Sequence, residues 1–269
     1  MAKAKKRAKA KPQSGKVKPR KPKKLVANAR IKAAAKKSAV RAAKGAPIGK
    51  ATKVKARKVD DALTLYGVFL SVPTAKVGMM LSMCGAKWNY RHVALRDGQH
   101  KTPEFQAMNR FAQVPVLRHG RRCIAQSNAI LQYLAQHFGR FQGRSESDAW
   151  RIAEWLSWDF DRLSSGVGLS RTFAKFQPQT PDEVKSYMRS RGEQALGMLD
   201  RHLGGSRFLV GGAPTIADIA VFPWIATADE GGFTVANYPN LQAWAERMLA
   251  LPGAAHPYTI LPKEDRVAA

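Results

Sequence analysis

The stretch from Gln113 to Leu134, QVPVLRHGRRCIAQSNAILQYL, decides the fold. Its first half, VPVLRHGRRCIA, is rich in strand-forming residues around a glycine and predicts a β-hairpin with its turn at His119-Gly120. In its second half, apolar side chains such as Ile130 and Leu134 recur at helical spacing, so a helix follows the hairpin directly. Two strands and a helix this close together predict one layered α/β unit.

The residues before this stretch supply the rest of the sheet. The run ALTLYGVF, which starts at Ala62, predicts a short strand, and AKVGMMLSMC after Pro73 predicts a helix. WNYRHVAL, from Trp88, alternates as a second strand does, and a loop with a short helix around residues 103–109 leads to the hairpin. The order βαβ followed by αββα predicts a mixed sheet with helices packed on both faces.

The residues after it are helical by periodicity. Residues 145–250 carry a strand signal only in VANY at residues 235–238. DAWRIAEWLSWDFDRLSSGVGLS, residues 148–170, predicts one long helix that bears several tryptophans. Thr215 with Asp218 three positions later predicts a capping box in front of an apolar helix.

Half of the basic residues are concentrated in the first 58 positions. The chain of 269 residues has a formal net charge of +27, and residues 1–58 hold 23 of its 46 Lys and Arg and no Asp or Glu. The other 23 bases face 19 acids, which leaves +4 for the rest of the chain. Residues 1–58 have too little apolar surface to offset the entropy cost of ordering. We therefore expect a disordered polycationic tail at residues 1–58, an α/β domain at residues 59–139 and an all-helical domain at residues 145–269.

The Lys, Ala and Pro composition of the tail is similar to the tails of linker histones and of bacterial histone-like proteins. A tail of this kind binds DNA or RNA by releasing counterions, so its binding ignores base sequence and weakens steeply with salt. A purely solubilising role, or attraction to anionic membranes or ribosomes, remains an alternative.

The sequence lacks the signals of several other classes of protein. No apolar run approaches the roughly 18 residues of a membrane-spanning helix, and no signal-peptide segment is present. Cys84 and Cys123 form neither a disulfide framework nor a CxxC motif, and there is no HExxH or Cys/His cluster. We therefore expect no disulfide and no metal, and a cytoplasmic location with association with the nucleoid through the tail.

Three motifs occur together in the α/β domain: LYGVFLSVP at residues 65–73, QVPVL at residues 113–117 and AQSNAILQYL at residues 125–134. In this order and spacing they resemble the thioredoxin-like domain of glutathione S-transferases of the theta-like or bacterial serine-type classes. TIAD at residues 215–218 resembles the folding motif of the C-terminal domain of the same family. The resemblance implies a thioredoxin-like βαβαββα domain, an all-helical C-terminal domain, glutathione as co-substrate and a homodimer.

The resemblance also implies which loop residues bind glutathione. The peptide between Val114 and Pro115 is cis in the family, which turns the backbone of Val114 toward the ligand; a trans proline on an edge strand is the alternative. His100 corresponds to a histidine that meets the glycine carboxylate of glutathione, with a solvent-facing loop histidine as the alternative. Gln113 stands where many relatives have lysine and keeps the hydrogen bond without the charge.

Gln126 and Ser127 stand where the helix after the hairpin begins. A helix N-terminus attracts anions with its unpaired N–H groups and its positive dipole end. The resemblance implies that both residues grip the γ-glutamyl end of glutathione. Ser127 also suits the N-cap of this helix.

Ser71 lies where the first predicted strand ends and a helix begins, so it suits an N-cap. The resemblance implies a second role, in which its hydroxyl donates a hydrogen bond to the glutathione sulfur. The thiol pKa must fall from about 8.5 to about 6.5 for thiolate to dominate at neutral pH, which requires about 2.7 kcal/mol. A hydrogen bond to a charged group contributes about 1.5–3 kcal/mol and a helix N-terminus about 0.3–1 kcal/mol, so the two together are sufficient without a cationic base. Tyr66, within the apolar run, is interpreted as packing.

In this family the long helix also forms a wall of the electrophile site, so Trp158 and Phe173 are the predicted pocket residues. We expect a glutathione transferase that activates the glutathione thiol for attack on a small hydrophobic electrophile. Dehalogenation, or reduction of disulfides or peroxides, would use the same thiolate. The alternative is a non-catalytic dimerisation module that presents basic tails to DNA or RNA.

Overall fold

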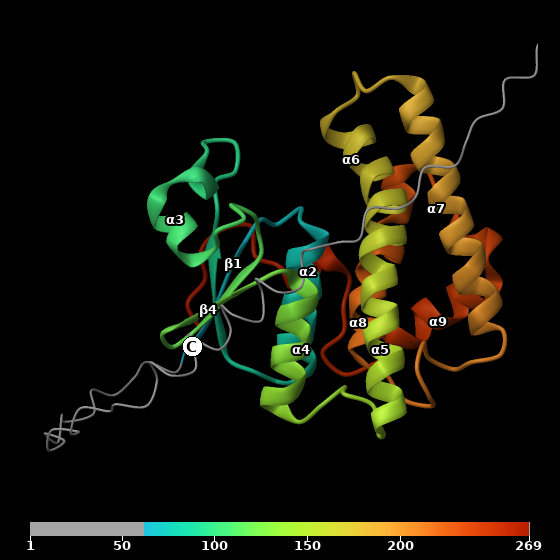
Figure 1. Ribbon diagram of the computed structural model, residues 1–269, viewed down its shortest axis with the longest axis horizontal. Coiled ribbons are helices and arrows are strands. Elements are labelled where there is room, and N and C mark those ends of the chain that lie inside the picture. The colour runs from blue at the N-terminus through green and yellow to red at the C-terminus, as the bar shows by residue number, and fades with distance from the viewer. Residues whose placement is uncertain (1–61, 269) are drawn as a thin grey trace, which may run out of the picture. The chain divides into compact units, whose positions relative to one another are not determined.

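A four-stranded mixed sheet begins the folded part of the chain (Figure 1). The computed structural model describes residues 62–268, so the predicted tail at residues 1–58 lies outside the described residues. The strand order is β2-β1-β3-β4, with β1 parallel to β2 and antiparallel to β3, and β3 antiparallel to β4. His119 still pairs with Arg122, so the hairpin turn falls at Gly120 and Arg121, one residue later than predicted. The strands are β1 (Leu63–Gly67), β2 (Trp88–His92), β3 (Val116–His119) and β4 (Arg122–Ala125).

Helices cover both faces of this sheet, as predicted (Figure 1). Leu65 and Leu117 are fully buried in the main core, together with residues of α2 and α4. On the other face, Phe105 of α3 and Val116 form a smaller core. The parallel βαβ unit and the hairpin followed by α4 give the thioredoxin-like arrangement that the resemblance implied. The helices are α2 (Val72–Met83), the 3-10 turn η1 (Gln99–Lys101), α3 (Pro103–Met108) and α4 (Ser127–Phe138).

The ends of these helices follow from their sequences. Pro73 lies in the first turn of α2, where the missing N–H has no intrahelical partner to lose, and Ser71 caps the helix. Gly139 follows α4 with a φ of 64°, a left-handed conformation that ends a helix at little cost only for glycine.

The second half of the chain is helical, as predicted, but its first helix is not uniform. Residues 148–170, expected as one α-helix, include α5, a π-helical segment η2 and the start of α6. A Cβ on Gly166 of η2 would lie 2.7 Å from the backbone nitrogen of Gly192 on α7, so glycine permits this close approach. None of the described helices is both long and apolar enough to span a bilayer. The helices of this half are α5 (Glu146–Trp158), η2 (Asp159–Gly168), α6 (Leu169–Phe176), α7 (Asp182–Leu203), α8 (Ile216–Ile225), η3 (Ala228–Gly231), η4 (Val235–Asn237), α9 (Pro239–Leu249) and α10 (Pro257–Ile260).

The strand signal in VANY is wrong. Val235–Asn237 form the 3-10 turn η4, in which the N–H of Tyr238 donates to the carbonyl of Val235 at 2.9 Å. Pro239 then begins α9. The backbone polar groups are satisfied locally, so the β-branched valine alone does not make a strand.

The predicted capping box is present at the start of α8. Thr215 accepts a hydrogen bond from Ala217 N, and Asp218 Oδ2 accepts one from Thr215 N at 2.9 Å. Asp218 Oδ1 also accepts from Leu209 N at 2.9 Å and from the indole of Trp244 at 3.0 Å. Burial raises the pKa of Asp218, while these hydrogen bonds act to lower it. The carboxylate therefore ties α8 to α9 and has a structural role.

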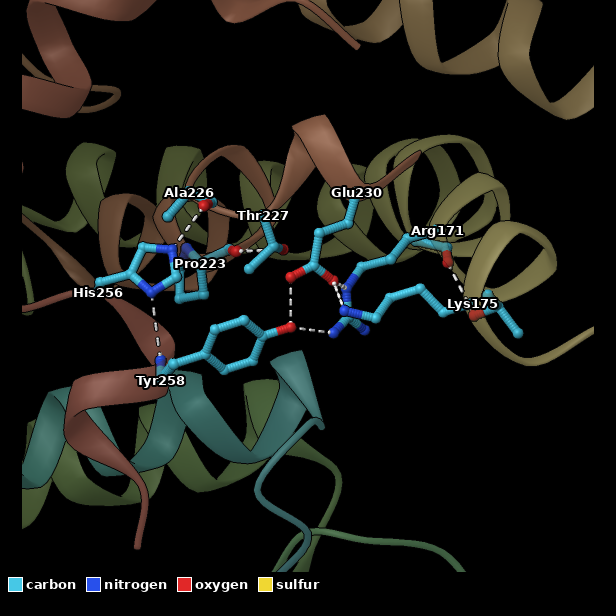
Figure 2. Close-up of polar contacts among 10 residues, drawn as sticks. Arg171, Lys175, Pro223, Ala226, Thr227, Glu230, His256 and Tyr258 are labelled. Carbon is cyan, nitrogen blue, oxygen red and sulfur yellow. Dashed lines mark hydrogen bonds and ion pairs between the residues drawn. The ribbon is translucent and has the colours of Figure 1, made fainter. Parts of the chain in front are cut away.

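The C-terminal segment that contains α10 (Pro257–Ile260) packs against the turn between β1 and α2. Figure 2 shows the hydroxyl of Tyr258 between Glu230 and Arg171: it donates to the Glu230 carboxylate, and Arg171 Nη2 donates to it at 2.7 Å. The Tyr258 ring stacks on Phe69 with ring centroids 5.3 Å apart. Because Phe69 lies two residues before Ser71, this contact supports the turn that carries Ser71.

Candidate functional site

A cavity of about 730 Å³ lies between the sheet and the helical half. Its walls come from α2, the loops before α3 and β3, the first turn of α4, and α5, η2 and α8. All six predicted glutathione-binding residues line it, although they come from separate segments of the chain. They are His100, Gln113, Val114, Pro115, Gln126 and Ser127.

The loop before β3 is held in place by a buried amide. The Val114–Pro115 peptide is cis, as the resemblance implied. Asn109, which is only 3% exposed, donates from Nδ2 to the carbonyl of Gln113 at 2.6 Å. Its Oδ1 accepts from Phe111 N at 3.0 Å. Asn109 therefore fixes the approach to the cis peptide, a role that its sequence context gave no signal for.

The first turn of α4 opens onto the cavity. Gln126 occupies the N-cap position with a φ of 68°, and its Nε2 donates to Gln113 Oε1 at 3.2 Å. Ser127 is the first helical residue, so the alternative that Ser127 is the N-cap is wrong. Its hydroxyl has no hydrogen-bond partner among the described residues, and the first N–H groups of a helix attract anions. This end of the cavity suits a carboxylate.

His100 lies in η1 and is half-buried. Its Nδ1 is enclosed and has no hydrogen-bond partner among residues 62–268. His100 lines the cavity and its Nδ1 is enclosed, so the ring is not the solvent-facing loop histidine of the alternative.

Ser71 is the N-cap of α2, as one of its two predicted roles required. Its Oγ accepts from Thr74 N at 3.2 Å, and its own proton has no acceptor within the described part of the chain. Ser71 does not itself line the cavity, whereas Pro73, two positions later, does. Tyr66 is not part of the lining; its ring faces the guanidinium of Arg118 at 5.9 Å, as expected for a packing residue.

A buried ion pair that the sequence did not reveal forms part of the cavity wall. Lys76 Nζ lies 2.6 Å from Asp159 Oδ2, with the two side chains 3% and 1% exposed. Asn128 Nδ2 donates to the same carboxylate oxygen at 2.9 Å, and the Lys76 ammonium faces the Trp224 ring at 5.1 Å. Burial lowers the pKa of Lys76, and the charge and hydrogen bond of Asp159 act against that decrease. The pair connects α2 to η2 across the two halves of the protein.

The predicted electrophile-pocket residues do not line the cavity. Trp158 packs edge-on against Trp155 with ring centroids 5.3 Å apart, and Phe173 is 9% exposed within α6. Phe160 and Ser164 of η2 line it instead, together with a tryptophan of α8. A π-helix holds more residues per turn than an α-helix, so side chains after residue 158 point in directions that α-helical periodicity does not predict.

The two cysteines play no part in this cavity. Cys84 and Cys123 are free and half-buried, and burial raises the pKa of both thiols. Within residues 62–268, no group of three or more His, Cys, Asp or Glu side chains is placed to hold a metal ion.

Comparison with known proteins identifies the family of both halves of the chain. The model of the glutathione S-transferase N-terminal domain matches residues 61–136, and that of the C-terminal domain matches residues 129–247. Glutathione S-transferase theta-2B of Homo sapiens is 30% identical over 201 residues, which cover 71% of this chain and 82% of the relative. The disulfide-bond oxidoreductase YghU of Escherichia coli is 24% identical over 184 residues, 63% of each protein. A solved glutathione transferase family member from Pseudomonas fluorescens, with two glutathione bound, has a TM-score of 0.65 at 25% identity, covering 74% of this chain and 92% of its own. The chain belongs to the glutathione S-transferase family.

Proposed function

We propose that this protein binds glutathione in the 730 Å³ cavity and activates its thiol for attack on a small hydrophobic electrophile. The observation that carries the proposal is the convergence of six predicted ligand residues, from separate segments, on one cavity. A scaffold that had lost its ligand would not need Ser127, in the first turn of α4, or His100 to line a cavity.

Glutathione would be held by groups at both ends of the tripeptide. The γ-glutamyl carboxylate suits the first turn of α4, with the Ser127 hydroxyl and the N–H groups beside it. The backbone of Val114 offers the N–H and C=O that pair with a peptide-like ligand, and His100 would meet the glycine carboxylate. Binding both reactants in one cavity also supplies proximity, which lowers the entropic part of the barrier.

We propose that Ser71, which lies beside the cavity two positions before the cavity-lining Pro73, stabilises the glutathione thiolate. Its oxygen is engaged as an acceptor by Thr74 N, so its proton is the group left to donate. A hydrogen bond from this proton to the sulfur, with the N-terminus of α2 beside it, supplies the roughly 2.7 kcal/mol needed for thiolate at neutral pH. No cationic base is required.

The second reactant would lie against Phe160, Ser164 and Trp224. Their mixture of aromatic surface and one hydroxyl fits a small apolar electrophile, and conjugation is the main expectation. Reduction of disulfides is a second candidate, since it uses the same thiolate. It is favoured by the similarity to an Escherichia coli disulfide-bond oxidoreductase and by the relative solved with two glutathione bound.

We further propose a cytoplasmic homodimer whose tails, residues 1–58, bind nucleic acid. The support for the tail is its sequence alone: 23 Lys and Arg without one acid. If glutathione is not bound, the alternative of a dimerisation module that presents basic tails replaces the enzymatic proposal.

Retention on glutathione resin and conjugation assays of the full chain test the enzymatic proposal. We expect Ser71→Ala to remain bound to the resin and to lose about 10- to 100-fold in kcat/KM, the equivalent of one hydrogen bond to a charged group. Ser82→Ala, in the same helix, is the matched control and should keep wild-type activity. Failure of the wild type to bind the resin would favour the scaffold, whereas a fully active Ser71→Ala variant would remove only the role of Ser71.

A further inference from the structure

The positive charge of the tail continues into the sheet half of the folded protein. Residues 62–145 hold 11 Lys and Arg but only two acids, Asp97 and Glu104, a net charge of +9. Residues 146–269 hold 12 Lys and Arg against 15 acids, a net charge of −3. Asp60 and Asp61 precede both halves and bring the net charge beyond residue 58 to +4, so this small total conceals two halves of opposite sign.

Three arginines gather where β3 turns into β4. Arg118, Arg121 and Arg122 are all exposed, and none has a carboxylate within ion-pair distance in the described part of the chain. The guanidinium of Arg118 faces the ring of Tyr66 at 5.9 Å, and that of Arg122 faces the ring of Tyr133 at 5.6 Å. Tyr66 belongs to the smaller core and Tyr133 packs against the main core, so Arg118 and Arg122 flank the hairpin from the two faces of the sheet, with their charges in solvent.

The same end of the sheet also receives the chain from the tail. A second cavity, of about 540 Å³, is lined by Lys87, His119 and His137 and by Ala62, the first described residue. In the sequence, Lys58 precedes Ala62 by four positions, with Asp60 and Asp61 between them. A polyanion that contacts the last basic residues of the tail is therefore within reach of this end of the sheet.

We propose that Lys87, Arg118, Arg121 and Arg122, here named the hairpin surface, bind the phosphate backbone of duplex DNA. Guanidinium groups present paired donors that match phosphate oxygens, and unpaired surface cations bind DNA by releasing its counterions. An anionic membrane is the rival partner, because it attracts surface cations by the same electrostatic force, and the test below separates the two. This inference adds a surface on the folded part to the proposed role of the tail.

The hairpin surface lies at the opposite end of the strands from the glutathione cavity. β1 enters at Leu63, opposite His119, and runs toward the turn that carries Ser71, where the cavity lies. DNA bound at the hairpin surface would leave the cavity open, so glutathione turnover should continue on the DNA-bound protein.

Salt-dependent binding to a short fluorescent duplex DNA tests this inference in the full chain. We expect the triple variant Arg118→Gln, Arg121→Gln, Arg122→Gln to reduce the slope of log K against log[salt] by about 2–3, since each phosphate contact contributes about 0.9. The matched control, Arg151→Gln, Arg201→Gln, Arg207→Gln, removes the same charge from exposed positions of the helical half and should bind like the wild type. Retention on glutathione resin verifies that both variants are folded.

The outcomes separate this inference from the proposed role of the tail. A third variant, Lys16→Gln, Lys18→Gln, Arg20→Gln, weakens binding if the tail contributes and does not if the tail proposal is wrong. Equal slopes for the hairpin and control variants would overturn the hairpin surface, whatever the tail variant does. Binding of the wild type to anionic phospholipid vesicles but not to DNA would overturn it in favour of a membrane.

Discussion

Lys76 and Asp159 show how one pair of residues joins the two halves of the protein at its cavity. Both side chains are almost fully buried, and 83 positions separate them in the sequence. Desolvation of two buried charges is costly, and their contact offsets this cost only while both partners are present. The carboxylate therefore depends on Lys76 and Asn128 for its charge to be tolerated in the interior.

Removing one partner of the Lys76–Asp159 pair should lower the free energy of unfolding more than removing both. We expect Lys76→Met to lower the free energy of unfolding by about 3–5 kcal/mol, because Asp159 is left as an uncompensated buried charge. The double variant Lys76→Met, Asp159→Leu should regain most of that loss, since a buried pair replaced by apolar residues is often near neutral. Urea denaturation of the three proteins measures this. A double variant no more stable than the single one would show that the two charges are not coupled.

At the scale of elements, the contact between the C-terminal segment and η3 supports the turn that carries Ser71. Glu230 of η3 lies 2.7 Å from Lys175 Nζ and from Arg171 Nε, and its carboxylate accepts a hydrogen bond from the Tyr258 hydroxyl. Partial burial alone would raise the pKa of Glu230, but the hydrogen bonds from Lys175, Tyr258 and Arg171 outweigh it and leave the pKa below its ordinary value. The cluster is thus stabilised by the ionised form of Glu230.

The sign of this pKa shift gives a pH dependence of stability. A carboxyl group with a lowered folded pKa contributes stability above its unfolded pKa of about 4.3 and loses it as the pH falls through the folded value. We expect the wild type to lose free energy of unfolding more steeply than Glu230→Gln as the pH falls below about 4.5. Glu154→Gln, at an exposed position of α5, should follow the wild type. Parallel curves for wild type and Glu230→Gln in acid denaturation would contradict the lowered pKa.

Most helices and strands were predictable from the sequence, whereas the π-helical segment η2 and the 3-10 turn η4 were not. Alternation and helical spacing identified the strands, α2, α4 and the capping box at Thr215, because those patterns reflect local burial. The π-helical segment η2 has no sequence pattern of its own. The α-helical spacing therefore favours Trp158 as the pocket residue, whereas Phe160 of η2 lines the cavity. The strand predicted at VANY, residues 235–238, is wrong for a related reason, since a strand needs a neighbouring strand to pair with and the local sequence does not encode that neighbour.

At the scale of the whole molecule, the sequence predicted which motifs line the cavity. It did not predict the long-range ion pair or the uneven distribution of charge between the two halves. The residues predicted to bind glutathione, in the motifs at residues 113–117 and 125–134 and at His100, line one cavity. The Lys76–Asp159 pair was not predictable, because no local pattern links positions so far apart. The asymmetry between a +9 sheet half and a −3 helical half was present in the sequence, but a single count beyond residue 58 averaged it away.

The most direct test of the account is the ultraviolet difference spectrum of protein-bound glutathione as a function of pH. For the wild type we predict a thiolate band already present at neutral pH, with an apparent thiol pKa near 6.5, about 2 below that of a free thiol. Ser71→Ala should bind glutathione and show the band only near a thiol pKa of about 8, because the N-terminus of α2 still contributes about 0.3–1 kcal/mol. Identical titrations for the two proteins, or no band at neutral pH in the wild type, would contradict the claim that the Ser71 hydroxyl activates glutathione.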